Sequence, residues 1–181
     1  MDGLEPQPVP KLIVVDLDGT VWWPEMYMLW GSGGPPFSKL PNGDVKAKDG
    51  TKVYLLEDTR AIMAAQLHDP AFAKSKLAIS SATDEPEWAQ QCLQLIEVEP
   101  GVSVKSLFSH ECISKGSKRT HFVQLQAMTG IAYNDMIFFD NEPRRVKEVA
   151  PLGVTAVHCP DGLTWKVWNK GMESWRKCNG V

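Results

Sequence analysis

A short apolar run that ends in two closely spaced aspartates constrains the fold of this chain more than any other feature. The run from Leu12 to Val15 is apolar throughout, which is typical of a strand that is buried on both faces. Asp16 follows directly, and Asp18 comes two residues later. Two carboxylates are costly to bury unless a cation or a reaction uses them. Because ligands of open α/β sheets bind outside the carboxyl ends of the strands, we interpret this stretch as the centre of a functional site.

Apolar runs alternate with helical patterns along the rest of the chain. The runs predict further strands at 77–80, 104–108, 135–139 and 154–157. The spacing of apolar residues predicts helices over 57–68, 85–96, 118–128, 142–149 and 164–177. Strands that alternate with helices indicate βαβ units, so the expected fold class is α/β with a mostly parallel sheet.

The stretch after the first strand is dense in glycine and proline, which argues against a long helix. Asp49-Gly50 lies between two short alternating runs and predicts a β-hairpin. A structureless loop of this length is uncommon in a compact domain unless it is functional. We therefore interpret residues 22–56 as a small flap and hairpin insertion over the carboxylates.

The length and composition of the chain are those of one globular domain. The chain has 181 residues, of which 43% are hydrophobic and 23% charged. We expect a disordered lead-in at residues 1–10 and a single domain at 11–181. The net charge of -3 shows no excess of basic residues, so nucleic acid is not an expected partner. No apolar run reaches the roughly 20 residues that a membrane-spanning helix needs, so we expect no membrane partner either.

The four cysteines form no Cys-x-x-Cys pair and no cluster with zinc spacing. This pattern favours the reduced thiols of a cytosolic or organellar-matrix protein, and we predict a cytoplasmic location. We also expect the protein to be a monomer.

Polar residues end further strands of the predicted sheet. Ser81 follows the second strand and Asp140 the third, while Lys118 begins a helix. Because the carboxyl ends of parallel strands meet at one edge of a sheet, these side chains should converge on Asp16. Ser80 is a rival for the position of Ser81. Three carboxylates, a hydroxyl and an ammonium group suit phosphoryl transfer to a carboxylate with the help of a hard divalent cation.

Each group has a task in that chemistry. Asp16 would attack phosphorus and hold it as an aspartyl-phosphate. Asp18 would protonate the leaving oxygen and then take a proton from water. Lys118 would pair with Asp16 and the phosphate, and Ser81 would donate a hydrogen bond to a phosphate oxygen. Mg²⁺, which prefers one or two carboxylates together with water and phosphate oxygens, would have Asp140 as its second carboxylate.

Two small residues complete the first stretch. Gly19 would remove a Cβ where the backbone passes close to the phosphate. Thr20 would hydrogen-bond locally and fix the turn.

Asp16-Leu17-Asp18-Gly19-Thr20 resembles the first motif of the haloacid dehalogenase superfamily, and within it the chain is most similar to the small magnesium-dependent phosphatases of type one. The similarity extends from about Leu12 to Glu173 and rests on later phrases in the same order: Pro35-Pro36-Phe37, Gly116-Ser117-Lys118, Thr120-His121-Phe122, Thr129-Gly130, Phe138-Phe139-Asp140 and Leu152-Gly153-Val154-Thr155.

The resemblance implies a Rossmann-like three-layer sandwich with a flap and no large cap domain. It also implies a Mg²⁺-dependent phosphomonoesterase with Asp16, Asp18 and Lys118 as catalytic residues. It implies that Mg²⁺ binds Asp16, the main-chain carbonyl of Asp18, and Asp140, with Asn141 beside them. Phosphate contacts are implied at Leu17, Asp18, Ser81, Ala82 and Lys118. The implied substrates are phosphotyrosine, as in a protein tyrosine phosphatase, or small sugar phosphates and phosphorylated sugar adducts of proteins.

The chain departs from the family pattern at two positions. Ala82 stands where the family often has arginine, so one guanidinium contact is missing. Asn141 stands where the family usually has a second aspartate, which removes a negative charge and predicts weaker Mg²⁺ binding.

Alternatives remain at this point. Asp140 could cap the next helix, Lys118 could be a solvated first-turn residue, and Trp22, Trp23 and Trp30 in the flap could contact substrate or only pack. Two other functions also fit the residues. One is phosphotransfer to a small acceptor, and the other is a non-catalytic binding domain.

Overall fold

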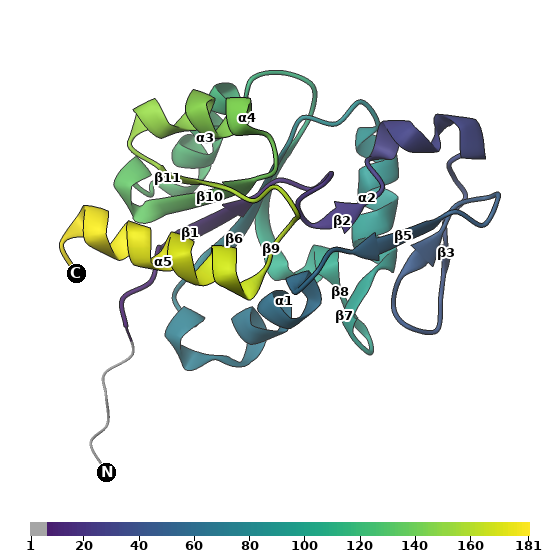
Figure 1. Ribbon diagram of the computed structural model, residues 1–181, viewed down its shortest axis with the longest axis horizontal. Coiled ribbons are helices and arrows are strands. Elements are labelled where there is room, and N and C mark those ends of the chain that lie inside the picture. The colour runs from purple at the N-terminus through teal and green to yellow at the C-terminus, as the bar shows by residue number, and fades with distance from the viewer. Residues whose placement is uncertain (1–6) are drawn as a thin grey trace, which may run out of the picture.

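The computed structural model describes residues 7–181. Residues 1–6 of the disordered lead-in expected at residues 1–10 lie outside the described residues. Within the described part, the central sheet has five parallel strands in the order β11-β10-β1-β6-β9 (Figure 1). Its strands are β1 (Leu12–Val15), β6 (Lys76–Ser81), β9 (Phe108–Ile113), β10 (Met136–Asp140) and β11 (Thr155–His158). The prediction of an α/β fold with a mostly parallel sheet is confirmed.

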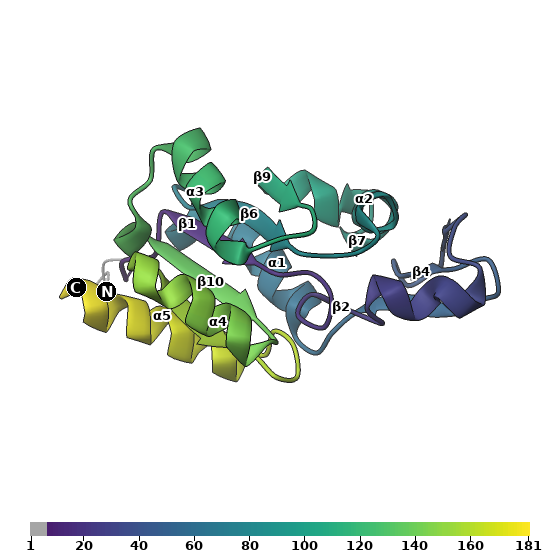
Figure 2. The same ribbon diagram turned by 90° about the horizontal axis from the view of Figure 1, so that it is seen from above.

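Helices cover both faces of this sheet and make the three layers visible in Figure 1, whereas Figure 2 looks down onto one covered face. One face packs on α3 (Lys118–Thr129) and α4 (Pro143–Val149), with Phe122 of α3 edge-on to Phe138. The other face packs on α1 (Thr59–His68), α2 (Pro86–Leu95) and α5 (Trp165–Asn179). There Trp168 stacks on Phe139 with ring centroids 5.1 Å apart. Adjacent residues of one strand thus supply the two halves of the core, as the pleat of a β-strand requires.

The chain between β1 and α1 forms a flap with a small sheet of its own (Figure 1). Its antiparallel strands lie in the order β2-β5-β4-β3, with bounds Trp22–Trp23, Lys52–Leu55, Val45–Lys46 and Ser38–Lys39. The pairing of Val45 with Val53 confirms the hairpin predicted around Asp49-Gly50. A 3₁₀ helix, Met26–Ser32, fills the first part of the flap.

The helix boundaries agree with the sequence to within a few residues, but one strand was misplaced. The sequence predicted a short strand at 104–108, whereas Val104–Leu107 is a 3₁₀ helix and the strand is β9, beginning at Phe108. β9 lies at the edge of the sheet and carries polar residues among apolar ones, so its pattern does not stand out as a buried run. A small hairpin of β7 (Glu97–Glu99) and β8 (Val102–Ser103) precedes it.

The cysteines are free at all four positions, three of them buried and Cys178 exposed. Among the described residues, no helix is long and apolar enough to cross a membrane.

Candidate active site

A cavity of about 210 Å³ lies at the carboxyl ends of β1 and β6, next to the first residues of the flap. The strand ends, the flap, α3 and α4 all contribute to its wall, which consists of Asp16, Asp18, Glu25, Tyr27, Ser81, Ala82, Thr83, Asp84, Lys118, Glu142, Arg144 and Arg145. Five residues expected at the site from the sequence therefore line one cavity: Asp16, Asp18, Ser81, Ala82 and Lys118.

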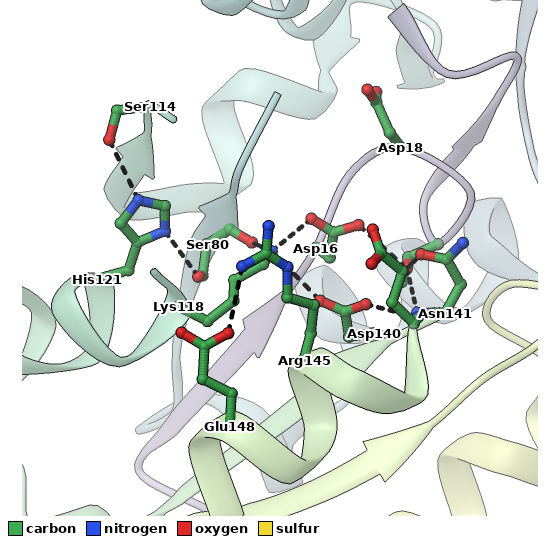
Figure 3. A network of polar contacts seen from close by, with 12 residues as sticks. Asp16, Asp18, Ser80, Ser114, Lys118, His121, Asp140, Asn141, Arg145 and Glu148 are labelled. Atoms are coloured by element: carbon green, nitrogen blue, oxygen red, sulfur yellow. Dashed lines mark hydrogen bonds and ion pairs between the residues drawn. The ribbon is translucent and has the colours of Figure 1, made fainter. Parts of the chain in front are cut away.

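Lys118 lies at the centre of the polar network beneath this cavity (Figure 3). Its side chain is 98% buried, and Nζ lies 2.6 Å from Asp16 Oδ1 and 3.3 Å from Asp140 Oδ2. Nζ also donates a hydrogen bond to the carbonyl of Ser80. A cation at the first residue of a helix is disfavoured by the helix dipole. The two carboxylates offset that cost, so the alternative of a solvated lysine is excluded.

Asp140 uses its two oxygens differently. Oδ1 accepts a hydrogen bond of 2.7 Å from the backbone N–H of Glu142, the N-cap residue of α4, so Asp140 is not itself the helix cap that the sequence left open. Oδ2 is buried and accepts no hydrogen bond from the described residues, although Lys118 Nζ lies 3.3 Å away. Burial, and then the charge of Asp16, raise the pKa of Asp140 above its ordinary value. The hydrogen bond to Glu142 and the binding of a cation are therefore compatible, because they use different oxygens of Asp140.

This arrangement fits a hard divalent cation with few protein ligands. Within residues 7–181, no group of three or more His, Cys, Asp or Glu side chains forms a ready metal site. Mg²⁺ commonly takes one or two carboxylates and completes its shell with water and phosphate oxygens. The neighbouring carboxylates of Asp16 and Asp140 provide such a pair. A cation there would offset both causes of the raised pKa of Asp140, burial first and then the charge of Asp16.

The two adjacent serines point to different environments. Ser81 lines the cavity, and its Oγ is buried without a hydrogen-bond partner among the described residues. Ser80 Oγ instead lies 3.0 Å from Nδ1 of His121 in α3, and His121 Nε2 lies 3.1 Å from Ser114 Oγ (Figure 3). Burial, and then the charge of Lys118, lower the pKa of His121 to about 4, so this ring is neutral near pH 7. Ser80 is thus excluded as the cavity hydroxyl.

The loop that follows β1 packs against the end of β10 through three residues, Gly19, Thr20 and Asn141. Gly19 has φ +75°, and a Cβ there would lie 2.4 Å from Asn141 Nδ2. The space made by this glycine therefore accommodates Asn141 rather than phosphate, which corrects the sequence interpretation. Thr20 Oγ1 accepts a 3.0 Å hydrogen bond from the Asn141 N–H and lies 3.4 Å from Asp16 Oδ2. Asn141 and the fully buried Leu17 do not line the cavity.

Asp18 is held by the flap. Trp22 Nε1 donates a 2.7 Å hydrogen bond to Asp18 Oδ1, and the N–H of Met26 donates one of 3.0 Å to Oδ2. Figure 3 shows the carboxyl group of Asp18 directed away from the cluster of Asp16 and Lys118. Burial, and then the charge of Asp16, raise the pKa of Asp18 to about 7, although both donors act in the opposite direction. A carboxyl group in this setting can exchange a proton near neutral pH.

The flap tryptophans do not line the cavity. Trp22 is fully buried, whereas Trp23 and Trp30 are exposed. Trp30 Nε1 donates a 2.7 Å hydrogen bond to Glu85 Oε1 at the start of α2 and so links the flap to the core domain. Tyr27 is an aromatic residue of the cavity wall that the sequence did not single out.

The sequence interpretation also missed the charged residues at the start of α4. Three residues that follow β10 belong to the cavity wall: Glu142, Arg144 and Arg145. Their position directly after Asp140 is the signal that could have identified them, because the first turn of a helix after a parallel strand lies at the ligand edge of the sheet.

A parallel sheet of this topology, with paired carboxylates, a hydroxyl and a buried lysine at its carboxyl edge, defines a phosphatase of the haloacid dehalogenase type. The Acid Phosphatase family matches residues 8–178. The chain belongs to this family.

Relatives and structures agree with that assignment. The chain is 35% identical over 173 residues to human Magnesium-dependent phosphatase 1, which covers 93% of this chain and 89% of the human protein. It is also 35% identical over 153 residues to a HAD-like hydrolase superfamily protein of Schizosaccharomyces pombe, covering 81% of this chain and 83% of that protein. A HAD family enzyme of Bacteroides thetaiotaomicron, solved with magnesium and inorganic phosphate, has a similar fold (TM-score 0.60, 12% identity, 86% and 97% of the two chains).

Proposed function

We propose that this phosphatase hydrolyses small phosphate monoesters with Mg²⁺, through an aspartyl-phosphate formed on Asp16. The observation that supports this most is the buried Lys118 beside the carboxylates of Asp16 and Asp140. An ammonium group buried at this point pairs with the carboxylate of Asp16 and adds positive charge where a phosphoryl group must approach it. The non-catalytic alternative is disfavoured, because it would leave these costly buried charges without a use.

The remaining residues have roles in the same reaction. Asp16 Oδ2 would attack phosphorus, since Oδ1 is engaged by Lys118. Ser81 would donate its hydroxyl proton to a phosphate oxygen, which provides the partner that its buried Oγ lacks. Asp16 and Asp140 would hold Mg²⁺ together with the main-chain carbonyl of Asp18, and the ion would neutralise charge on the phosphoryl oxygens.

Asp18 would move the proton. With a pKa near 7, its carboxyl group is partly protonated at neutral pH and can protonate the leaving oxygen. The carboxylate that remains would then take a proton from the water that hydrolyses the aspartyl-phosphate.

The cavity suits compact substrates. Its volume of about 210 Å³ accommodates a phosphoryl group and a small part of the leaving group, and Tyr27 offers an aromatic surface at the wall. We propose phosphotyrosine and small sugar phosphates as the substrate classes, the first presented on a phosphoprotein or as a small molecule.

Turnover of p-nitrophenyl phosphate tests the proposal. We expect hydrolysis that stops when the metal is chelated and returns when Mg²⁺ is added. Release of inorganic phosphate in equal amount to p-nitrophenol, with and without added alcohols or sugars, distinguishes hydrolysis from phosphotransfer. Failure of Mg²⁺ to restore turnover would contradict the cofactor assignment, and a phosphorylated acceptor as the main product would favour the phosphotransferase.

The contact between Trp22 and Asp18 leads to a second prediction. Trp22→Phe removes the Nε1–H that holds Asp18 Oδ1, so the acid should be less well positioned. We expect kcat to fall roughly tenfold with an alkyl phosphate, whose leaving oxygen needs a proton, and much less with p-nitrophenyl phosphate. The ratio of kcat for the two substrates is the measurement.

Trp175→Phe is the matched control. Trp175 is also buried and donates from Nε1 to a backbone carbonyl, that of Asn134, at 2.9 Å, but it lies on α5 and does not contact the cavity. Both variants lose the same atoms and one hydrogen bond. Equal leaving-group dependence in the two variants would mean that Trp22 contributes only packing.

A further inference from the structure

The cavity is richer in acidic groups than in basic ones. Five carboxylates line it, from Asp16, Asp18, Glu25, Asp84 and Glu142, against three cations, Lys118, Arg144 and Arg145. A phosphate dianion must bind in this surrounding, so each cation with hydrogen-bond donors to spare is important. The other wall residue next to Ser81 is Ala82, which offers only a methyl group.

Two of the three cations are already engaged with acidic residues of the cavity. Lys118 is paired with Asp16 and also donates to the carbonyl of Ser80. Arg144 is paired with Glu142 through Nε, and its side chain is 74% exposed. Solvent screens this exposed ion pair, so it holds Arg144 less firmly than a buried contact would.

Arg145 differs from both. Its side chain is 17% exposed, and both hydrogen bonds that it donates to described residues come from Nη1, to the carbonyl of Gly116 and to Glu148 Oε2, each at 3.2 Å. Its Nε is buried and has no hydrogen-bond partner among residues 7–181. Glu148 does not belong to the cavity wall. Figure 3 shows the guanidinium extending from α4 toward Lys118.

The guanidinium is therefore fixed on one side and has donors to spare on the other. An arginine held in this way loses little side-chain entropy when an oxyanion binds, and its planar group matches two phosphate oxygens at once. Its unpaired Nε also gains if a small rotation brings it toward an acceptor, because a buried unpaired donor is costly.

We infer that Arg145 is a phosphate-binding residue, which contacts the non-bridging oxygens of the phosphoryl group held over Asp16. This inference rests on the proposed function and adds to it the residue that supplies the guanidinium contact. The contact is with the phosphoryl group rather than the leaving group, so it acts on the ester and on inorganic phosphate alike.

A purely structural role is the alternative to be tested. Glu148 accepts hydrogen bonds from Ser117 Oγ and from the N–H of Arg119, as well as from Arg145. Arg145 could thus serve only to connect α4 with the loop that precedes Lys118. In that case, loss of Glu148 would affect phosphate binding as much as loss of Arg145.

Inorganic phosphate is the probe for the experiment. Its competitive inhibition constant against p-nitrophenyl phosphate, and its effect on Tm in the presence of Mg²⁺, would be measured for the wild type and four variants: Arg145→Gln, Arg145→Lys, Lys147→Gln and Glu148→Gln. We expect Arg145→Gln to raise the inhibition constant about ten- to a hundredfold, as for loss of one charge-assisted hydrogen bond, and to abolish most of the rise in Tm. Lys147 is exposed on the same helix, so its variant should resemble the wild type.

The outcomes separate the alternatives. Wild-type inhibition by phosphate in Arg145→Gln would overturn the inference while leaving the proposed function intact, provided that the wild type turns over. An equal loss of phosphate binding in Glu148→Gln would overturn it in favour of the structural connection. If Arg145→Gln does not fold, Arg145→Lys replaces it. The lysine keeps the charge but not the planar group, so an unchanged inhibition constant would contradict the inference.

Discussion

We expect the Asp16→Asn variant to lose at least about a thousandfold of its turnover and to keep its fold. The amide has the shape of the carboxylate and can still accept a hydrogen bond from Lys118, but it cannot attack phosphorus. Rapid acid quenching with labelled ester should trap a hydroxylamine-sensitive phosphoryl group on the wild-type chain and none on the variant.

Asp135→Asn is the matched control for this experiment. Asp135 precedes β10 at the edge of the sheet opposite the cavity and pairs with Lys11 at the surface. The same change of charge there should leave turnover and trapping unaltered. Turnover close to the wild-type rate in Asp16→Asn, or a trapped label on that variant, would disprove the nucleophile assignment.

The second large effect is expected for Lys118→Met. Methionine fills a similar volume, but it removes the charge that lies between Asp16 and Asp140. We expect kcat to fall roughly a hundred- to a thousandfold, because positive charge at the phosphoryl group is lost in the transition state. Single-turnover kinetics at saturating substrate would measure this loss separately from any change in affinity.

Lys115→Met tests the specificity of that effect. Lys115 lies in the loop that precedes α3, three residues before Lys118, and its exposed side chain pairs with Asp84. The variant should retain turnover close to that of the wild type. An unchanged kcat in Lys118→Met would mean that Lys118 has no direct part in the reaction.

The sequence predicts those site residues whose positions follow from the ends of the strands. Asp16 and Asp140 end buried apolar runs and Lys118 begins a periodic helix, so a parallel sheet alone brings them together. The choice between Ser80 and Ser81 could not be made in the same way. It depends on which face of β6 meets His121 of α3, and this follows from packing rather than from the pattern within the strand.

The contacts of Asp18 and Arg145 were beyond sequence analysis for other reasons. The hydrogen bond from Trp22 to Asp18 depends on the turn that leads into the flap, and a tryptophan in such a stretch gives no sign of its partner. Arg145 lies in a short polar helix where arginine is an ordinary surface residue. Only the three-dimensional arrangement distinguishes it from Lys147, which is exposed on the same helix.

The local origin of the donors to Asp18 has a consequence for protein engineering. Trp22 and Met26 lie four and eight positions after Asp18, so a single short segment contains the acid and the groups that orient it. The flap beyond Met26 contains neither the acid nor its two donors, although it packs on the core through Leu29 and Phe37 and pairs with Arg60 through Asp44. Residues 28–51 do not line the cavity, so a graft of this segment that preserves those contacts should leave the proton-transfer group in its setting.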